Sequence, residues 1–168
     1  QHLYFYKNGN LVVDSDFVSG NISKGNGTPV GAYPVTYTER NATLKGENYS
    51  SDVSFWMPYC GNVGMHDASW RSTFGGNIYK RNGSHGCVNL PYAAAKTIFE
   101  NIAAGYPVLV YELPGTESPK AIAMDQGASV VDAINGIGEV SLGSGGAITN
   151  ARNAYNGLSE EAKSYVSN

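Results

Sequence analysis

The sequence predicts a mainly β domain with one principal helix, followed by a small α-helical module. Residues 1–113 are rich in Tyr, Thr, Val and Gly, a composition that favours short strands joined by turns. Residues 91–104 form the one segment of this region with a clear helical pattern. Of the 19 aromatic residues, 17 lie before residue 114, so the composition changes there. We therefore place a domain boundary near residue 114.

A β-hairpin is predicted at the start of the chain. Residues 3–6 and 11–13 are apolar runs that flank Lys7–Asn10. The Asn-Gly pair between them is a strong hairpin signal, because both residues tolerate a positive φ angle. Further strands are predicted at residues 29–37, 53–59 and 108–111.

The predicted helix at residues 91–104 has a start signal, a stop signal and one apolar stripe. Pro91 suits the first turn, where its missing N–H costs nothing. Gly105 suits the C-terminal end. The residues of the stripe repeat every four positions and would be buried on one face: Leu90, Ala94, Ile98 and Ile102.

The rest of the chain is predicted to be a linker and a helical module. Residues 114–120 contain two prolines among small polar residues, which is typical of a linker. The first domain is therefore predicted to comprise residues 1–113. Residues 121–168 are predicted to form a partial helical module, since no stop signal precedes the chain end. Short helices are expected near residues 127–138, 146–157 and 160–167.

Composition excludes several classes of protein. The net charge is −3, which argues against nucleic-acid binding, because that needs a basic surface. No stretch approaches the roughly 20 apolar residues of a membrane span. Two cysteines are too few for a disulfide framework or a four-cysteine zinc site.

The chemistry-bearing segment is Ser84–Asn89, with the sequence Ser-His-Gly-Cys-Val-Asn. The Cys87 thiolate is a strong nucleophile, and the start of the following helix is expected to favour its negative charge. Gly86 would let a substrate carbonyl approach the backbone. The backbone amides of His85, Gly86 and Cys87 could then face a developing oxyanion.

A nucleophilic thiol also needs an imidazole base, and two histidines compete for this role. His85 is two residues from Cys87, so on an extended chain the two side chains stand parallel, roughly 6.6 Å apart. His66 is 21 residues upstream, a separation that two strands, or a strand and a loop, can bridge in space.

The motif Ser84–Asn89 with a spaced upstream His66 resembles the signature of the L,D-transpeptidase catalytic domain, the YkuD family. His66–Trp70 and Thr28–Tyr33 resemble further segments of that family. The resemblance covers about residues 1–113 and implies a β-sandwich or barrel-like domain with one main helix.

The resemblance also implies a role for each residue of the motif. Cys87 would be the acyl-accepting nucleophile, and His66 the general base, held in its tautomer by a backbone carbonyl such as that of Asp67. A tyrosine hydroxyl often assists in the family, and Tyr49 matches that position best. The oxyanion hole and the order of the catalytic loop would depend on His85, Gly86, Ser84 and Asn89.

The function that the resemblance implies is an L,D-transpeptidase acting on peptidoglycan stem peptides. It would form 3→3 cross-links through a Cys thioester and release D-Ala, with no metal or organic cofactor. Hydrolysis at the same site, an L,D-carboxypeptidase activity, is the alternative. The family is typically acylated by carbapenems, so a covalent carbapenem adduct is expected. The protein is expected at the cell wall, outside a Gram-positive bacterium.

Several residues keep two interpretations. Trp70 either packs in the core or in a loop, or forms a wall of the substrate groove. Arg71 is either solvent-exposed or contacts a substrate carboxylate. Cys60 is interpreted as a small buried or half-buried strand residue, with a Cys60–Cys87 disulfide as the alternative. A zinc site built from the histidines and cysteines is disfavoured, because the ligand spacing is wrong. For residues 114–168 a wall-binding role stays open.

Overall fold

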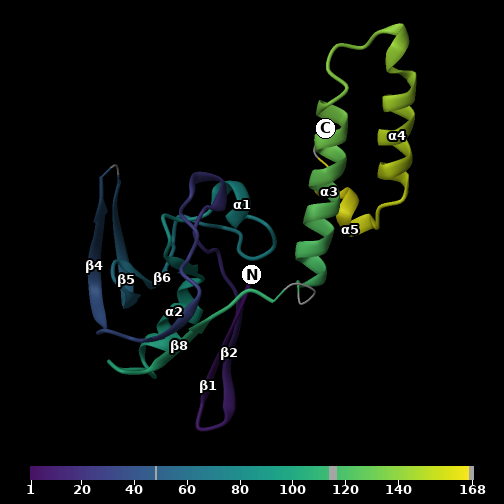
Figure 1. Cartoon of the computed structure of the whole chain (residues 1–168). Coiled ribbons are helices and arrows are strands. Elements are labelled where there is room, and N and C mark those ends of the chain that lie inside the picture. Colours follow the sequence, from purple (N-terminus) through teal and green to yellow (C-terminus); the bar gives the residue numbers. More distant parts are fainter. Residues whose placement is uncertain (48, 114–116, 167–168) are drawn as a thin grey trace. The chain divides into compact units, whose positions relative to one another are not determined.

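The computed structural model describes residues 1–47, 49–113 and 117–166. The chain divides into two compact units, Gln1–Thr116 and Glu117–Asn168, called here the N-terminal unit and the C-terminal unit. The N-terminal unit is mainly β and the C-terminal unit is helical, which confirms the predicted fold class (Figure 1). Residues 114–116 of the predicted linker lie outside the described residues.

The first two strands form the predicted hairpin. Strand β1 (His2–Lys7) pairs antiparallel with β2 (Asn10–Asp16). Asn8 and Gly9 both have positive φ, of 51° and 79°, as the tight turn requires. His2 is part of the strand, where its ring contacts the carboxylates of Asp14 and Asp16.

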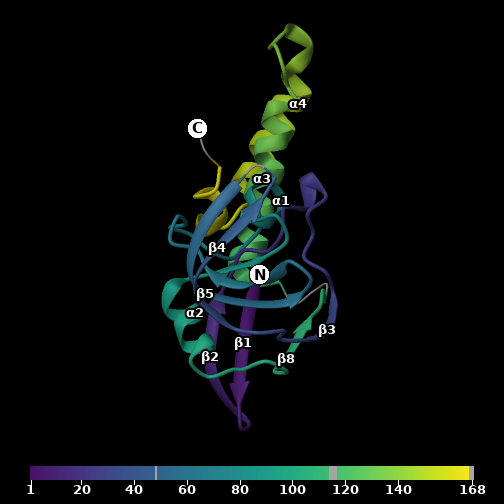
Figure 2. The same cartoon turned by 90° about the vertical axis from the view of Figure 1, so that its left-hand side faces the viewer.

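A second pair and a four-stranded sheet complete the β structure. Strand β3 (Gly31–Pro34) runs antiparallel beside β8 (Pro107–Val110) (Figure 2). The larger sheet has the order β4-β5-β6-β7. Its strands are β4 (Glu39–Gly46), β5 (Tyr49–Cys60), β6 (Val63–Asp67) and β7 (Val88–Leu90). Strands β4 and β5 form a long hairpin (Figure 1).

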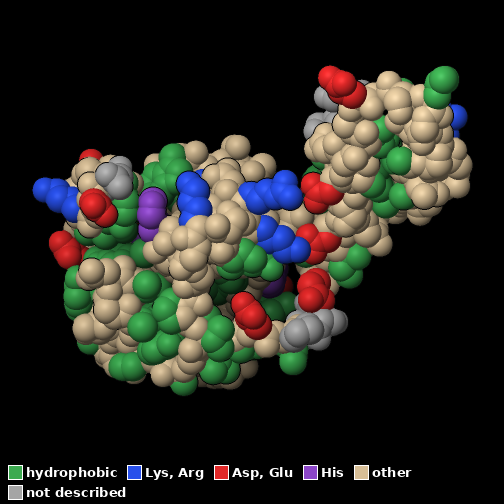
Figure 3. Space-filling model, turned by 45° about the horizontal axis from the view of Figure 1, so that its top comes forward, with side chains coloured by type: hydrophobic (Ala, Val, Ile, Leu, Met, Phe, Trp, Pro, Cys, Tyr) green, Lys and Arg blue, Asp and Glu red, His purple; other side chains and the backbone are tan. Residues whose placement is uncertain are grey.

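The core lies on one face of the four-stranded sheet. Phe55 and Met57 of β5, Met65 of β6 and Leu90 of β7 are buried there against Ile98. Because side chains alternate along a strand, the residues between them face the other side of the sheet. Hydrophobic side chains are also exposed over much of the face of the N-terminal unit that Figure 3 shows. Over the unit as a whole, the exposed hydrophobic residues include Tyr4, Trp70 and Leu109.

The principal helix, α2 (Tyr92–Phe99), starts after Pro91 as predicted and ends five residues early. The side chain of Asn101 donates to the carbonyl oxygen of Thr97 at 2.8 Å, while the Asn101 amide donates to Ile98. The side chain thus occupies the acceptor that the next helical amide would use, and the helix stops. Gly105, with φ of 87°, lies in the turn before β8.

Two short helical segments complete the N-terminal unit. They are the 3₁₀ turn η1 (Ile22–Lys24) and the helix α1 (Tyr79–Asn82), which contact each other. Neither has an apolar stripe long enough to be predicted from periodicity.

Within residues 117–166 the C-terminal unit contains three helices and one 3₁₀ turn: α3 (Pro119–Asn135), η2 (Leu142–Ser144), α4 (Gly145–Asn156) and α5 (Glu160–Lys163). Helix α3 starts eight residues before the predicted position and takes in the end of the predicted linker. Ser118 accepts a hydrogen bond from the Ala121 amide, and Pro119 occupies the first turn, so these residues begin the helix. Small side chains pack α3 against α5, among them Ala123, Gly127 and Ala162.

Candidate active site

His66 and Cys87 lie on the same face of the four-stranded sheet, opposite the core. Strands β6 and β7 are parallel and pair Met65 with Val88, which places Gly64 level with Cys87. His66 follows two residues after Gly64 and therefore faces the same side as Cys87. Strand spacing and rise separate the two Cα atoms by roughly 8 Å. The tertiary fold thus brings together two residues that are 21 positions apart.

The imidazole of His66 has a defined tautomer. Its Nδ1 donates a hydrogen bond to the Asp67 carbonyl oxygen at 2.8 Å, and the residue is only 3% exposed. Burial lowers the pKa of His66, and the nearby positive charge of Arg71 lowers it further. The hydrogen bond to the Asp67 backbone and the negative charge of Asp67 act in the opposite direction, but the pKa stays below its ordinary value. His66 is therefore neutral at pH 7, with Nε2 free to accept a proton.

Two tryptophans flank this imidazole. The ring centroids of Trp56 and Trp70 lie 5.9 and 5.8 Å from that of His66. Trp56 is buried, whereas Trp70 is 51% exposed. Trp70 therefore lies beside His66 and is not a core residue, so packing in a loop and a wall of the substrate groove stay as its two interpretations.

The carboxylate of Asp67 binds the backbone of a neighbouring strand. Its Oδ1 accepts the amides of Ser54 and Phe55 at 2.8 and 2.9 Å. The carboxylate therefore holds β5 against β6, and only the Asp67 carbonyl orients His66.

The sulfur of Cys87 is half-buried and lies against β6. It donates a hydrogen bond to the Asn62 carbonyl oxygen at 3.6 Å. Burial raises the pKa of the Cys87 thiol, and a backbone hydrogen bond from Gly64 opposes the rise. The predicted help from the helix start is wrong, because β7 separates Cys87 from α2 and the field of a helix end falls off within one turn. The resting site is thus a neutral thiol beside a neutral imidazole.

Ser84 organises the catalytic loop. Its Oγ accepts the Gly86 amide at 3.0 Å and donates to the Cys87 carbonyl oxygen at 2.5 Å. The predicted oxyanion role of the Gly86 amide is therefore wrong, because Ser84 already uses that N–H. The amides of His85 and Cys87 are left as the candidate donors.

Gly86 is required by its backbone conformation. Its φ angle is +128°, a region that side chains with a Cβ rarely adopt. An added Cβ would also lie 3.2 Å from Val63 Cγ2. Glycine therefore allows the loop to turn tightly before Cys87.

A segment missed as part of the site, residues 18–28, supports the catalytic loop from the side away from β6. Val18 and Asn89 exchange two backbone hydrogen bonds, at 3.0 and 2.9 Å. The Asn21 amide donates to the Ser84 carbonyl oxygen, and the Asn21 side chain donates to the Arg81 carbonyl oxygen. The Thr28 hydroxyl donates to the Gly86 carbonyl oxygen at 2.7 Å. Only the Thr-Pro-x-Gly pattern around Thr28 marked this segment in the sequence.

The remaining predicted site residues lie around His66 and the catalytic loop. Asn89 is 2% exposed, is level with His66 in the sheet, and its Oδ1 has no partner among the described residues. The exposed His85 ring stacks on Tyr49 of the β4–β5 hairpin, with centroids 4.5 Å apart and an interplanar angle of 19°. Arg71 is half-buried, and its Nη1 donates to the carbonyl oxygen of Asn82 at 3.0 Å, so the side chain is held by the end of α1.

The family assignment follows from residues 1–110, which match the profile of the L,D-transpeptidase catalytic domain, YkuD. The chain belongs to this family. The comparison with curated protein sequences gave no match.

Solved structures of L,D-transpeptidases resemble the N-terminal unit. A cysteine-to-serine mutant of the Enterococcus faecium enzyme is 41% identical, with a TM-score of 0.62, over 66% of this chain and 46% of that chain. The Ldtfm–avibactam carbamoyl enzyme is also 41% identical, with a TM-score of 0.63, over 67% and 46%. The NMR structure of the E. faecium catalytic domain acylated by ertapenem is 41% identical, with a TM-score of 0.60, over 66% and 89%. The chain thus spans about half the length of the first two proteins.

Cys60 and Cys87 are both free in this L,D-transpeptidase domain. Cys60 ends β5, Cys87 precedes β7, and β6 lies between those strands. Two strand spacings separate the Cα atoms by roughly 9–10 Å, beyond the roughly 7 Å that a disulfide spans. Cys60 is a half-buried strand residue, as the sequence predicts, and packs against the core.

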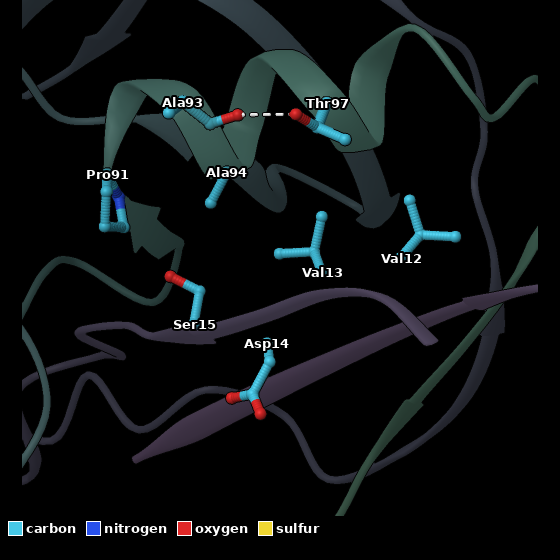
Figure 4. A pocket seen from close by; sticks show the side chains of 8 residues that line it. All are labelled: Val12, Val13, Asp14, Ser15, Pro91, Ala93, Ala94 and Thr97. Atoms are coloured by element: carbon cyan, nitrogen blue, oxygen red, sulfur yellow. Dashed lines mark hydrogen bonds between the residues drawn. The ribbon is translucent and has the colours of Figure 1, made fainter. Parts of the chain in front are cut away.

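A surface hollow of about 340 Å³ lies away from the L,D-transpeptidase motif, between β2 and the start of α2 (Figure 4). It is lined by residues such as Val12, Asp14, Ala94 and Thr97, and by none of the predicted site residues. In the described ranges no group of three His, Cys, Asp or Glu side chains could hold a metal ion. None of the helices in these ranges is long and apolar enough to cross a membrane.

Proposed function

We propose that this protein forms 3→3 cross-links in peptidoglycan by an acyl-enzyme mechanism on Cys87. The donor is a tetrapeptide stem, whose amide between the third residue and the terminal D-Ala is broken. The acceptor is an amine on a neighbouring stem. We further propose that the protein acts at the cell wall, outside a Gram-positive bacterium, a proposal supported by its similarity to Enterococcus faecium domains.

One observation carries this proposal: His66 is locked by the Asp67 carbonyl and faces the same side of the sheet as Cys87. The protonated Nδ1 leaves Nε2 as the only basic nitrogen. A neutral base beside a neutral thiol supports proton transfer at the moment of attack, so a preformed ion pair is not needed.

The first half-reaction makes a thioester. His66 Nε2 takes the thiol proton as Cys87 Sγ attacks the amide carbonyl carbon and forms the C–S bond. The amides of His85 and Cys87 stabilise the oxyanion. The C–N bond then breaks, and the D-Ala amine leaves with the proton that His66 returns.

The second half-reaction transfers the acyl group. His66 Nε2 takes a proton from the acceptor amine, which attacks the thioester carbonyl and forms the new amide. The C–S bond breaks, and the thiol of Cys87 regains its proton from His66.

The test of the nucleophile is intact mass after exposure to a carbapenem. The related E. faecium catalytic domain has been solved in a form acylated by ertapenem, which supports a carbapenem as the probe. We expect one covalent adduct on the wild type and none on Cys87→Ala, with Cys60→Ala as the matched control that still acylates. An adduct that persists in Cys87→Ala would overturn the assignment.

The test of the reaction is a product assay with purified tetrapeptide muropeptides. Cross-linked dimers together with free D-Ala support the proposal. Tripeptide as the sole product would identify an L,D-carboxypeptidase instead and would overturn the transferase assignment.

A further inference from the structure

The hydroxyl of Thr28 connects two backbone segments at the candidate active site. It accepts the Gly20 amide at 2.9 Å and donates to the Gly86 carbonyl oxygen at 2.7 Å. Gly86 immediately precedes Cys87, 58–59 residues further along the chain. The side chain of Thr28 therefore acts directly on the peptide bond that leads into the nucleophile.

This peptide bond carries one of the two candidate oxyanion donors. In a trans peptide the carbonyl of one residue and the N–H of the next point in opposite directions. A donor that holds the Gly86 carbonyl oxygen on one side thus fixes the Cys87 N–H on the other side. A hydrogen bond to the carbonyl also polarises the peptide group and makes its N–H a stronger donor.

We propose that Thr28 is a positioning residue that aims and polarises the Cys87 amide for oxyanion stabilisation. The inference rests on the proposed acyl-enzyme function and adds a residue outside the motif to it. Both hydrogen bonds of the Thr28 hydroxyl go to backbone groups, so its effect on Cys87 would pass through the Gly86–Cys87 peptide bond.

The residues around the Gly86–Cys87 peptide bond leave it little freedom to adjust if the Thr28 hydroxyl is lost. A Cβ added to Gly20 would lie 1.7 Å from the Asn26 carbonyl oxygen and 2.9 Å from Gly86 Cα, so the two backbones are in close contact. The other side of the loop is held by Ser84, which binds the Gly86 amide and the Cys87 carbonyl oxygen. Thr28 is thus the side chain that holds the Gly86 carbonyl oxygen, and a replacement would require the packed segments to separate.

The test compares three variants in two reactions of Cys87. Thr28→Val removes the hydroxyl and keeps the shape, and Thr28→Ser keeps the hydroxyl. Thr97→Val is the matched control, because the Thr97 hydroxyl donates to Ala93 within α2, away from the motif. The first reaction is acylation by a carbapenem, which passes through an oxyanion. The second is alkylation by iodoacetamide, which attacks at a saturated carbon and forms no oxyanion.

We expect Thr28→Val to slow carbapenem acylation about 10- to 100-fold, somewhat less than the loss of an oxyanion donor itself. Iodoacetamide alkylation should change less than twofold, because the thiol and His66 are untouched. Thr28→Ser should recover most of the acylation rate, and Thr97→Val should match the wild type in both reactions. Melting curves of all variants define the temperature range in which each is folded.

Three outcomes would overturn the inference. In the first, Thr28→Val slows both reactions equally, which would indicate a loosened loop. In the second, Thr28→Val is acylated at the wild-type rate. In the third, Thr28→Ser does not recover the acylation rate. Failure of the proposed function is a separate result, because the wild type itself would then form no adduct on Cys87.

Discussion

His66 Nδ1 donates a hydrogen bond to the backbone carbonyl oxygen of Asp67 at 2.8 Å and not to the side-chain carboxylate of the same buried residue. That carboxylate instead accepts two amides of β5. The base is therefore oriented by the main chain, and the acidic side chain has a structural role. Substitutions at positions 66 and 67 are therefore expected to have different effects, the first on activity and the second on stability.

His66→Ala should abolish acylation by a carbapenem, whereas Asp67→Ala should mainly lower stability. Loss of the carboxylate leaves the buried amide of Phe55 and that of Ser54 without their charged acceptor, a cost of about 3 kcal/mol in the free energy of unfolding. Denaturant unfolding measures that cost, and acylation per folded molecule measures activity. If folded Asp67→Ala were as inactive as His66→Ala, a side-chain triad would be the better mechanism.

The pH dependence of acylation should show an acid limb with a midpoint below 6.5. Burial lowers the pKa of His66 from its ordinary value of 6.5, and the neutral imidazole is the active form. Activity is therefore retained as pH falls through 6.5 and is lost only when pH passes the lowered pKa. Rates of carbapenem acylation between pH 4 and 9 measure this midpoint. A midpoint at or above 7 would contradict a buried neutral base.

Cys87→Ser should fold normally and lose nearly all transfer activity. A hydroxyl has a pKa far above that of a thiol, and a neutral imidazole is too weak a base to activate it at pH 7. Thermal melting checks the fold, and dimer formation from muropeptides checks the activity. Substantial dimer formation by the serine variant would argue against Cys87 as the nucleophile.

Tyr49 should act through its ring, which stacks on His85. Such a contact contributes about 0.5–1.5 kcal/mol, so Tyr49→Ala should slow acylation by up to about tenfold. Tyr49→Phe keeps the ring and should stay within about twofold of the wild type. Equal losses in the two variants would instead assign the effect to the hydroxyl, which is the role that the family resemblance implies.

Removal of the C-terminal unit should leave the chemistry intact. All the candidate catalytic residues lie before position 90, so a truncated chain ending at Leu113 should keep its carbapenem acylation rate and its melting temperature within a few degrees. The helices of the C-terminal unit bury mostly small side chains and have a thin core of their own. Unfolding of the truncated chain would show that the helices are part of the catalytic fold.

Local signals in the sequence were enough for much of the fold. The Asn8-Gly9 turn, the start of α2 directly after Pro91 and the helical character of the C-terminal unit depend on neighbouring residues, and these predictions are confirmed. The end of α2 was predicted too late, because the Asn101 side chain takes the Thr97 carbonyl and periodicity does not register such a contact. Helix α3 was predicted too late for a similar reason, since the Ser118 cap overrides the turn tendency of the segment.

The sequence by itself determined which residues carry the chemistry: a nucleophilic cysteine in Ser84–Asn89 and an upstream histidine at a spacing typical of one family. Only the tertiary structure decided how they are used. It placed Cys87 just before strand β7 and not at a helix start, and burial there raises the pKa of the thiol. It also gave the Gly86 amide to Ser84. It also brought Thr28 to the catalytic loop. Hydrogen bonds between residues about 60 positions apart depend on how strands pair and pack, and no local pattern in the chain encodes that pairing.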